Sequence, residues 1–156
     1  MRTRIVLSLS LLMVAAGCGG GLPLAPVEGI VLLDGQPLPN ATVRFIPQSK
    51  EGSSSIAETD ADGKFQLTYT RDKSGAWIGK HKVRVNTSKV ISETSGLETH
   101  IVEKVPDRYN QKTTLEYEVK SGRNTFELSL RSGGPISTST NPALAPRLVN
   151  RNNPCD

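Results

Sequence analysis

The chain has 156 residues, the length of one domain, and only 4% of them are aromatic, so we expect a small, aliphatic core. Its 14 glycines and 10 prolines favour many short strands over long helices. The formal net charge is +4, and the loss of two N-terminal arginines with an export signal leaves 17 basic against 15 acidic residues. An excess of that size is too small to indicate nucleic acid or an acidic membrane surface as a partner.

Residues 1–17 have the features of an export signal. A positively charged start is followed by an apolar run over residues 5–14 and by the small residues Ala15-Ala16-Gly17, which suit a peptidase cut. The apolar run is much shorter than the roughly 20 residues that a membrane-spanning helix needs. We therefore expect the signal to be removed from the mature protein.

A cysteine, Cys18, stands directly after this signal. The sequence Ala-Ala-Gly-Cys resembles the bacterial lipobox, although the Leu usual three residues before the cysteine is replaced by Ala15. The resemblance implies a lipoprotein of the bacterial cell envelope, held at a membrane by acyl chains such as palmitate on Cys18. The alternative is an ordinary secretory signal with a coincidental cysteine. The glycines that follow favour the lipoprotein, because residues 18–26 suit a flexible tether.

The second cysteine, Cys155, has no partner within the chain if Cys18 carries lipid. It is then either an exposed free thiol, which is the simpler interpretation, or one half of an intermolecular disulfide.

From residue 27 onward, apolar and polar residues alternate with the period of two that is typical of strands. Turn residues separate the segments, with turns expected at 34–35, 60–63 and 75–79 and a hairpin at Ser121-Gly122. Residues 88–103 are expected to form a mainly polar connection. The predicted strands are 27–34, 41–46, 56–59, 64–69, 80–85, 115–120 and 124–130.

This pattern predicts an all-β fold, a transthyretin-like or immunoglobulin-like β-sandwich of about seven strands over residues 27–131. No segment after the signal has a convincing helical period. Residues 132–156 carry four prolines among Ser, Thr and Asn, and they are predicted to be a disordered tail.

Several motifs in this region follow one another in a characteristic order. Together they resemble the carboxypeptidase regulatory-like domain, and the later segments 105–110 and 122–130 resemble the closing part of small bacterial lipoproteins with that domain. The resemblance implies a transthyretin-like sandwich at the cell envelope, but no chemistry. One departure is His81, where the family usually has Tyr. The motifs are Val27-Glu-Gly-Ile-Val, Asp34-Gly-Gln-Pro-Leu, Asn40-Ala-Thr-Val, Thr59-Asp-Ala-Asp-Gly-Lys-Phe and Gly79-Lys-His-Lys-Val-Arg-Val.

The acidic segment from Asp60 to Gly63 has two interpretations. Oxygen ligands at alternate positions before a glycine occur in calcium loops, but the following positions hold Lys64 and Arg71 instead of ligands. We therefore expect a tight turn, in which Asp60 caps the main chain and Gly63 has a positive φ angle. No metal site and no cofactor is predicted.

Catalytic residues are not apparent. The two histidines, His81 and His100, have no cysteine pair near them for zinc, and no Gly-x-Ser-x-Gly motif presents a nucleophile. His81 has the inward phase of its strand and is expected to pack at the border of the core. We expect a protein that is not an enzyme.

Two aromatic residues are candidate ligand contacts. Trp77 is expected in a turn, where it either caps one end of the sandwich or stacks on a sugar ring, and Tyr109 lies in a later loop. The first functional hypothesis is a structural or protein-interaction module of the cell envelope. The alternative is a domain that binds a glycan or secreted polymer through Trp77 and Tyr109.

Overall fold

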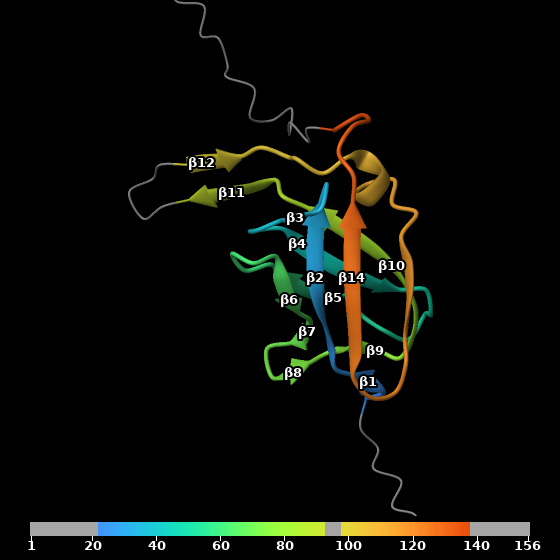
Figure 1. Ribbon diagram of the computed structural model, residues 1–156. Coiled ribbons are helices and arrows are strands. Elements are labelled where there is room, and N and C mark those ends of the chain that lie inside the picture. The colour runs from blue at the N-terminus through green and yellow to red at the C-terminus, as the bar shows by residue number, and fades with distance from the viewer. Residues whose placement is uncertain (1–21, 93–97, 138–156) are drawn as a thin grey trace, which may run out of the picture.

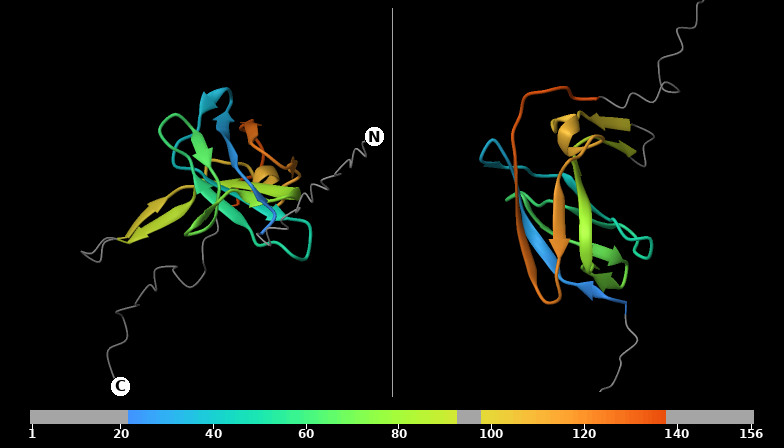
Figure 2. Two further views of the ribbon diagram at one scale, coloured as in Figure 1. Left: turned by 90° about the horizontal axis from the view of Figure 1, so that it is seen from below. Right: turned by 90° about the vertical axis from the view of Figure 1, so that its right-hand side faces the viewer.

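A computed structural model describes residues 22–92 and 98–137. Two sheets pack face to face and form the predicted all-β sandwich (Figures 1 and 2). The six-stranded sheet has the order β13 (Glu116–Val119), β10 (Gly79–Asn86), β4 (Thr42–Pro47), β5 (Ser55–Glu58), β7 (Thr68–Thr70) and β8 (Lys73–Ser74). The four-stranded sheet consists of β14 (Asn124–Leu130), β2 (Val27–Leu33), β3 (Gln36–Pro37) and β6 (Lys64–Gln66).

Two further strand pairs and one short helix complete the described chain. β1 (Leu24–Ala25) pairs with β9 (Ala76–Trp77), and β11 (Lys89–Ser92) pairs with β12 (Glu98–Ile101). A single turn of 3-10 helix, η1, covers Asp107–Tyr109. Within residues 22–92 and 98–137, the structure contains no helix with the length and apolar character that a membrane span requires.

The core lies between the two sheets and is mainly aliphatic, as the composition predicted. The alternation predicted for β4 and β10 is confirmed, because Val43, Phe45, Val83 and Val85 are fully buried while Arg44 of β4 and Lys82 and Arg84 of β10 are exposed. Phe45 lies at the centre of an aromatic cluster, with ring centroids 5.8–6.4 Å from those of its aromatic neighbours.

The hairpin predicted at Ser121-Gly122 is wrong. β13 pairs with β10 in the six-stranded sheet, whereas β14 pairs in parallel with β2 in the other sheet, so the chain crosses between the layers. The buried side chain of Asn124 shapes this crossing. Its amide donates to the carbonyls of Lys120 and Gly122 at 2.8 and 2.9 Å, and its oxygen accepts from the Lys120 N–H.

The single strand predicted over 64–69 is divided between the two sheets. β6 pairs with β2, and β7 pairs with β5. Leu67 lies between them, fully buried, and its N–H bonds the carbonyl of Val27. The alternation of inward and outward residues was predicted correctly. The passage of the chain from one sheet to the other does not change which residues point inward, so the alternation gives no sign of it.

Two predicted connections contain strands. The segment 75–79, expected to be a turn, includes β9, which pairs with β1 near the start of the described chain. The polar connection expected over 88–103 contains β11 and β12. Strands of two or four residues with few inward apolar residues give too short an alternation of apolar and polar residues to be recognised in the sequence.

The beginning of the predicted tail lies against the sandwich. The N–H and hydroxyl of Ser137 both donate to the carboxylate of Asp107 at 2.6 Å, and the Asp107 N–H donates to the carbonyl of Pro135. The hydrogen bonds from Ser137 lower the pKa of Asp107. Residues 138–156, the rest of that prediction, lie outside the described residues.

Candidate interaction surface

A two-stranded hairpin projects from one end of the sandwich (Figures 1 and 2). We call β11 and β12, together with the adjoining Val102, the arm. Apolar side chains are unusually exposed on it, since Val90 is 52%, Ile91 43% and Val102 66% exposed. Exposed apolar residues that gather on one element mark interaction sites more often than those that are scattered singly.

The strand register distributes these side chains over both faces of the arm. Val90 pairs with His100, so these two residues share one face. Ile91 pairs with Thr99 and shares the other face. Among the described strands, β11 and β12 pair only with each other, so each has an outer edge that is not paired with another described strand.

The base of the arm is held by the buried carboxylate of Glu103, which follows β12. Its two carboxylate oxygens accept hydrogen bonds of 2.9–3.4 Å from the segment before β11 and from the segment after β12. These bonds join the two segments. The donors are the main-chain N–H groups of Thr87, Ser88, Lys104 and Val105, the hydroxyls of Thr87 and Ser88, and the side-chain amide of Asn110.

No ion pair among the described residues includes Glu103. Its negative charge is therefore stabilised by these hydrogen-bond donors. Burial by itself would raise the pKa of the Glu103 carboxyl, but hydrogen bonds from Thr87, Val105 and Ser88 outweigh it and lower the pKa. Glu103 is therefore a carboxylate at neutral pH, and it fixes both legs of the arm. Glu103 could not be recognised from the sequence, since a lone Glu in a polar segment carries no signal.

An ion pair connects the arm to the sandwich. The ammonium of Lys89 lies 2.5 Å from a carboxylate oxygen of Glu58 at the end of β5. Together with the Glu103 cluster, this contact restrains the direction in which the arm projects.

The two predicted ligand contacts lie on separate parts of the sandwich. Trp77 is on β9, near the end where the described chain begins, and η1 lies near the opposite end (Figure 1). The structure does not bring Trp77 and Tyr109 together, so they do not form one site.

Trp77 packs against its neighbours and is only partly exposed. Its ring centroid lies 6.4 Å from that of Tyr69, and a Cβ atom at Gly52 would come within 2.9 Å of the indole. These contacts favour the interpretation of Trp77 as a cap on one end of the sandwich.

Tyr109 takes part in holding the chain after β14. Its hydroxyl accepts from the Arg131 N–H at 3.3 Å, and its ring lies under the guanidinium of Arg108, 4.8 Å from the centroid. Arg108 in turn donates to the carbonyls of Arg131, Ser132 and Gly133. The other predicted sites, Cys18 and Cys155, lie outside the described residues.

His81 lies deeper in the core than the sequence analysis predicted. It is fully buried against Phe45, its Nδ1 lies 3.0 Å from the carbonyl oxygen of Gly79, and its Nε2 has no hydrogen-bond partner among the described residues. Burial lowers the pKa of His81, although the hydrogen bond to Gly79 opposes this effect. The neutral imidazole therefore serves as a core side chain.

The turn predicted after Thr59 is confirmed. Asp60 Oδ1 accepts from the N–H groups of Asp62 and Lys64 at 3.0 and 2.8 Å, and Gly63 has a φ angle of 73°. In the described part of the chain, no group of three or more His, Cys, Asp or Glu residues is arranged to hold a metal ion.

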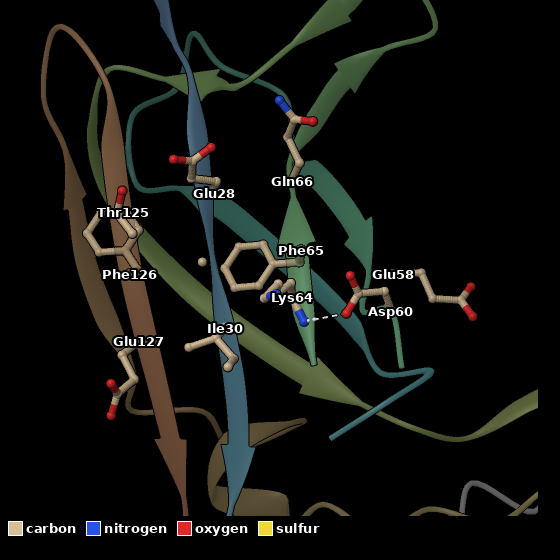
Figure 3. A pocket seen from close by; sticks show the side chains of 11 residues that line it. Glu28, Ile30, Glu58, Asp60, Lys64, Phe65, Gln66, Thr125, Phe126 and Glu127 are labelled. Carbon is tan, nitrogen blue, oxygen red and sulfur yellow. Dashed lines mark hydrogen bonds between the residues drawn. The ribbon is translucent and has the colours of Figure 1, made fainter. Parts of the chain in front are cut away.

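A shallow groove of about 870 Å³ crosses β2, β6 and β14 (Figure 3). Gly29 is in its floor, where a Cβ atom would lie 2.1 Å from the Phe126 carbonyl oxygen and 2.8 Å from the Phe65 ring. The carboxylates around it are already engaged in part: Glu28 pairs with Arg123, and Glu58 pairs with Lys89. The lining residues are Glu28, Gly29, Ile30, Glu58, Asp60, Lys64, Phe65, Gln66, Thr125, Phe126 and Glu127.

The fold and its arm define a small all-β sandwich module. Residues 27–122 match the family model described as "Domain of unknown function (DUF6795)", and the chain belongs to that family. No curated protein matches the chain.

Two solved structures are similar to the chain at low identity. One is a 9R-lipoxygenase from Cyanothece PCC8801, with a TM-score of 0.41 and 15% identity, covering 80% of this chain and 20% of that one. The other is a DUF3823 family protein from Parabacteroides merdae ATCC 43184, with a TM-score of 0.40 and 14% identity, covering 76% of this chain and 51% of that one. The chain thus spans a fifth and about half of the lengths of these two proteins.

Proposed function

We propose that this protein is a lipid-anchored module of the bacterial cell envelope that binds another envelope protein through its arm and catalyses no reaction. The observation that carries the proposal is the exposure of Val90, Ile91 and Val102 on a hairpin with open strand edges. A partner strand that adds to such an edge gains main-chain hydrogen bonds, and the apolar side chains add specificity.

The arrangement of the chain supports this role. The described chain begins at Leu22 beside β1, at the end of the sandwich opposite to the arm (Figure 1). A lipid on Cys18, only a few residues earlier, would keep that end near the membrane. The arm would then lie on the far side, accessible to another protein of the envelope.

The finer family assignment is also part of the proposal. The sandwich and the ordered motifs in residues 27–131 support a relationship to carboxypeptidase regulatory-like domains. Such a relationship is consistent with a binding or spacer role, and it supplies no catalytic residues.

A glycan site built from Trp77 and Tyr109 is less well supported than the arm. The indole of Trp77 packs beside Gly52 and Tyr69, while the hydroxyl of Tyr109 bonds the main chain of Arg131. Trp77 and Tyr109 do not line a common groove.

A photo-reactive amino acid placed at Val90 or Val102 in the full-length protein tests the proposal in cells. We expect each variant to give one discrete cross-linked adduct of the same partner. The matched control is the same substitution at Ile78, which is also exposed but lies next to β9. Absence of adducts from the arm positions, or equal adducts from Ile78, would contradict the proposal.

A further inference from the structure

The outer face of the six-stranded sheet carries two arginines on neighbouring strands. Arg84 of β10 and Arg44 of β4 are direct partners in the antiparallel register, and both are exposed. From this pair we infer a second binding function: the face binds an anionic polysaccharide, one whose sugars carry carboxylate or sulfate groups.

The pair is unfavourable in the isolated protein. Side chains at directly opposite positions have Cβ atoms about 4.5–5.5 Å apart, and like charges there destabilise the sheet. Within the described part of the chain, neither guanidinium has an ion pair or a hydrogen bond to compensate for this repulsion. A bound ligand with negative charge would remove the repulsion.

The positive charge is concentrated at this pair and not along the whole strand. Lys80 and Lys82 also alternate with the buried residues of β10, but their register partners on β13 are Glu118 and Glu116. The partner of Arg44 on the other side is Ile56 of β5, an apolar side chain that is 41% exposed. The Arg84–Arg44 pair therefore has an aliphatic direct neighbour where the lysines have carboxylates. The nearest carboxylates in the register, Glu58 opposite Thr42 and Glu116 opposite Lys82, are only diagonal to the arginines.

These side chains suit a polysaccharide better than a small anion. The guanidinium group presents a planar set of donors that matches carboxylate and sulfate oxygens, and two adjacent groups can bind successive charges of a polymer. Ile56 offers an apolar surface for a sugar ring. Neither arginine lines the groove that crosses β2, β6 and β14.

The geometry also distinguishes a polymer from a lipid surface. The six-stranded sheet forms one side of the sandwich, between the end that carries β1 and the end that carries the arm (Figures 1 and 2). The proposed anchor on Cys18 would attach the membrane to the end that carries β1 and not to this face.

Binding of the purified, detergent-solubilised full-length protein to immobilised polyuronate, to dextran sulfate and to neutral dextran tests the inference. We expect binding to one or both anionic polymers, none to neutral dextran, and weaker binding as salt increases. The double variant R44T/R84T should lose at least tenfold in affinity. The matched control R71T/K73T removes the same charge from the β7–β8 turn and the first residue of β8. Neither residue has an ion pair among the described residues, and this variant should retain binding.

Three results would overturn the inference: binding to neither anionic polymer, equal loss in both double variants, or binding to anionic lipid vesicles without binding to either polymer. A thermal melt separates binding from folding. Because repulsion is removed, R44T/R84T should melt at the same temperature as the wild type or higher, and a decrease of several degrees would instead make the pair structural. This experiment does not involve the arm, so its failure leaves the proposed protein interaction unaffected.

Discussion

Glu103 illustrates at the scale of a single residue how a buried charge can be retained without an opposite charge. Its carboxylate accepts hydrogen bonds, most of them from main-chain N–H groups on both legs of the arm. Such N–H groups would be left unsatisfied if the acceptor were removed, and each would then cost free energy. Glu103 therefore stabilises the connection between the arm and the sandwich.

The substitution Glu103→Gln tests this role. At pH 7 it should lower the free energy of unfolding by roughly 2–3 kcal/mol, because the new NH₂ group faces donors and the charged acceptor is lost. Urea denaturation measures the change. The matched control, Glu118→Gln on β13, changes an exposed carboxylate and should leave the free energy nearly unchanged.

The pH dependence of the same variant follows from the lowered pKa of Glu103. Its stabilising contribution is complete above the ordinary Glu pKa of 4.5 and is lost as the pH falls through the lower folded-state value. The difference in stability between the wild type and Glu103→Gln should therefore shrink on acidification below about pH 4.5. A constant difference down to pH 3 would contradict the assignment.

At the scale of elements, the crossing between β13 and β14 decides how the sandwich closes. Asn124 is buried where the chain leaves one sheet for the other, and its side chain makes the hydrogen bonds that a tight hairpin would have supplied. Its main-chain N–H also starts the parallel pairing by donating to the carbonyl of Pro26.

Asn124→Ala should destabilise the protein by about 3 kcal/mol, since several hydrogen bonds of one buried amide are lost together. Thermal and urea unfolding would measure this effect. Thr125→Ala, an exposed position on the same strand, provides the comparison and should cost much less. Equal effects of the two variants would show that the amide does not shape the crossing.

The arm shows which elements sequence patterns reveal and which they do not. The strands β2, β4, β10 and β14 were predicted because each buries several alternate residues, and that alternation is a property of one strand alone. On β11 and β12, none of the residues 89–91 and 99–101 is buried, so these strands lack the alternation. In the candidate site, neither the arm nor the Glu103 cluster at its base could have been predicted from the sequence, because Thr87 and Glu103 come together only in the folded chain.

At the scale of the whole molecule, the proposed anchor determines how the other surfaces are presented. Cys18→Ser should move the protein from the membrane fraction to the soluble fraction, because each lipid methylene contributes about 0.8 kcal/mol to membrane binding. Fractionation with immunoblotting measures this. Cys155→Ser should leave the protein at the membrane, and retention of Cys18→Ser there would contradict the lipid anchor.

The sequence by itself determined the all-β class, the inward face of the longer strands and the turn after Thr59, since these depend on residues close together in the chain. The tertiary structure alone decided which sheet each strand joins, because pairing depends on hydrogen bonds between distant segments. It also decided where charge gathers. The small net charge indicated neither nucleic acid nor an acidic membrane surface as a partner. The register of β4 with β10 nevertheless places Arg44 beside Arg84, and net charge contains no information about register.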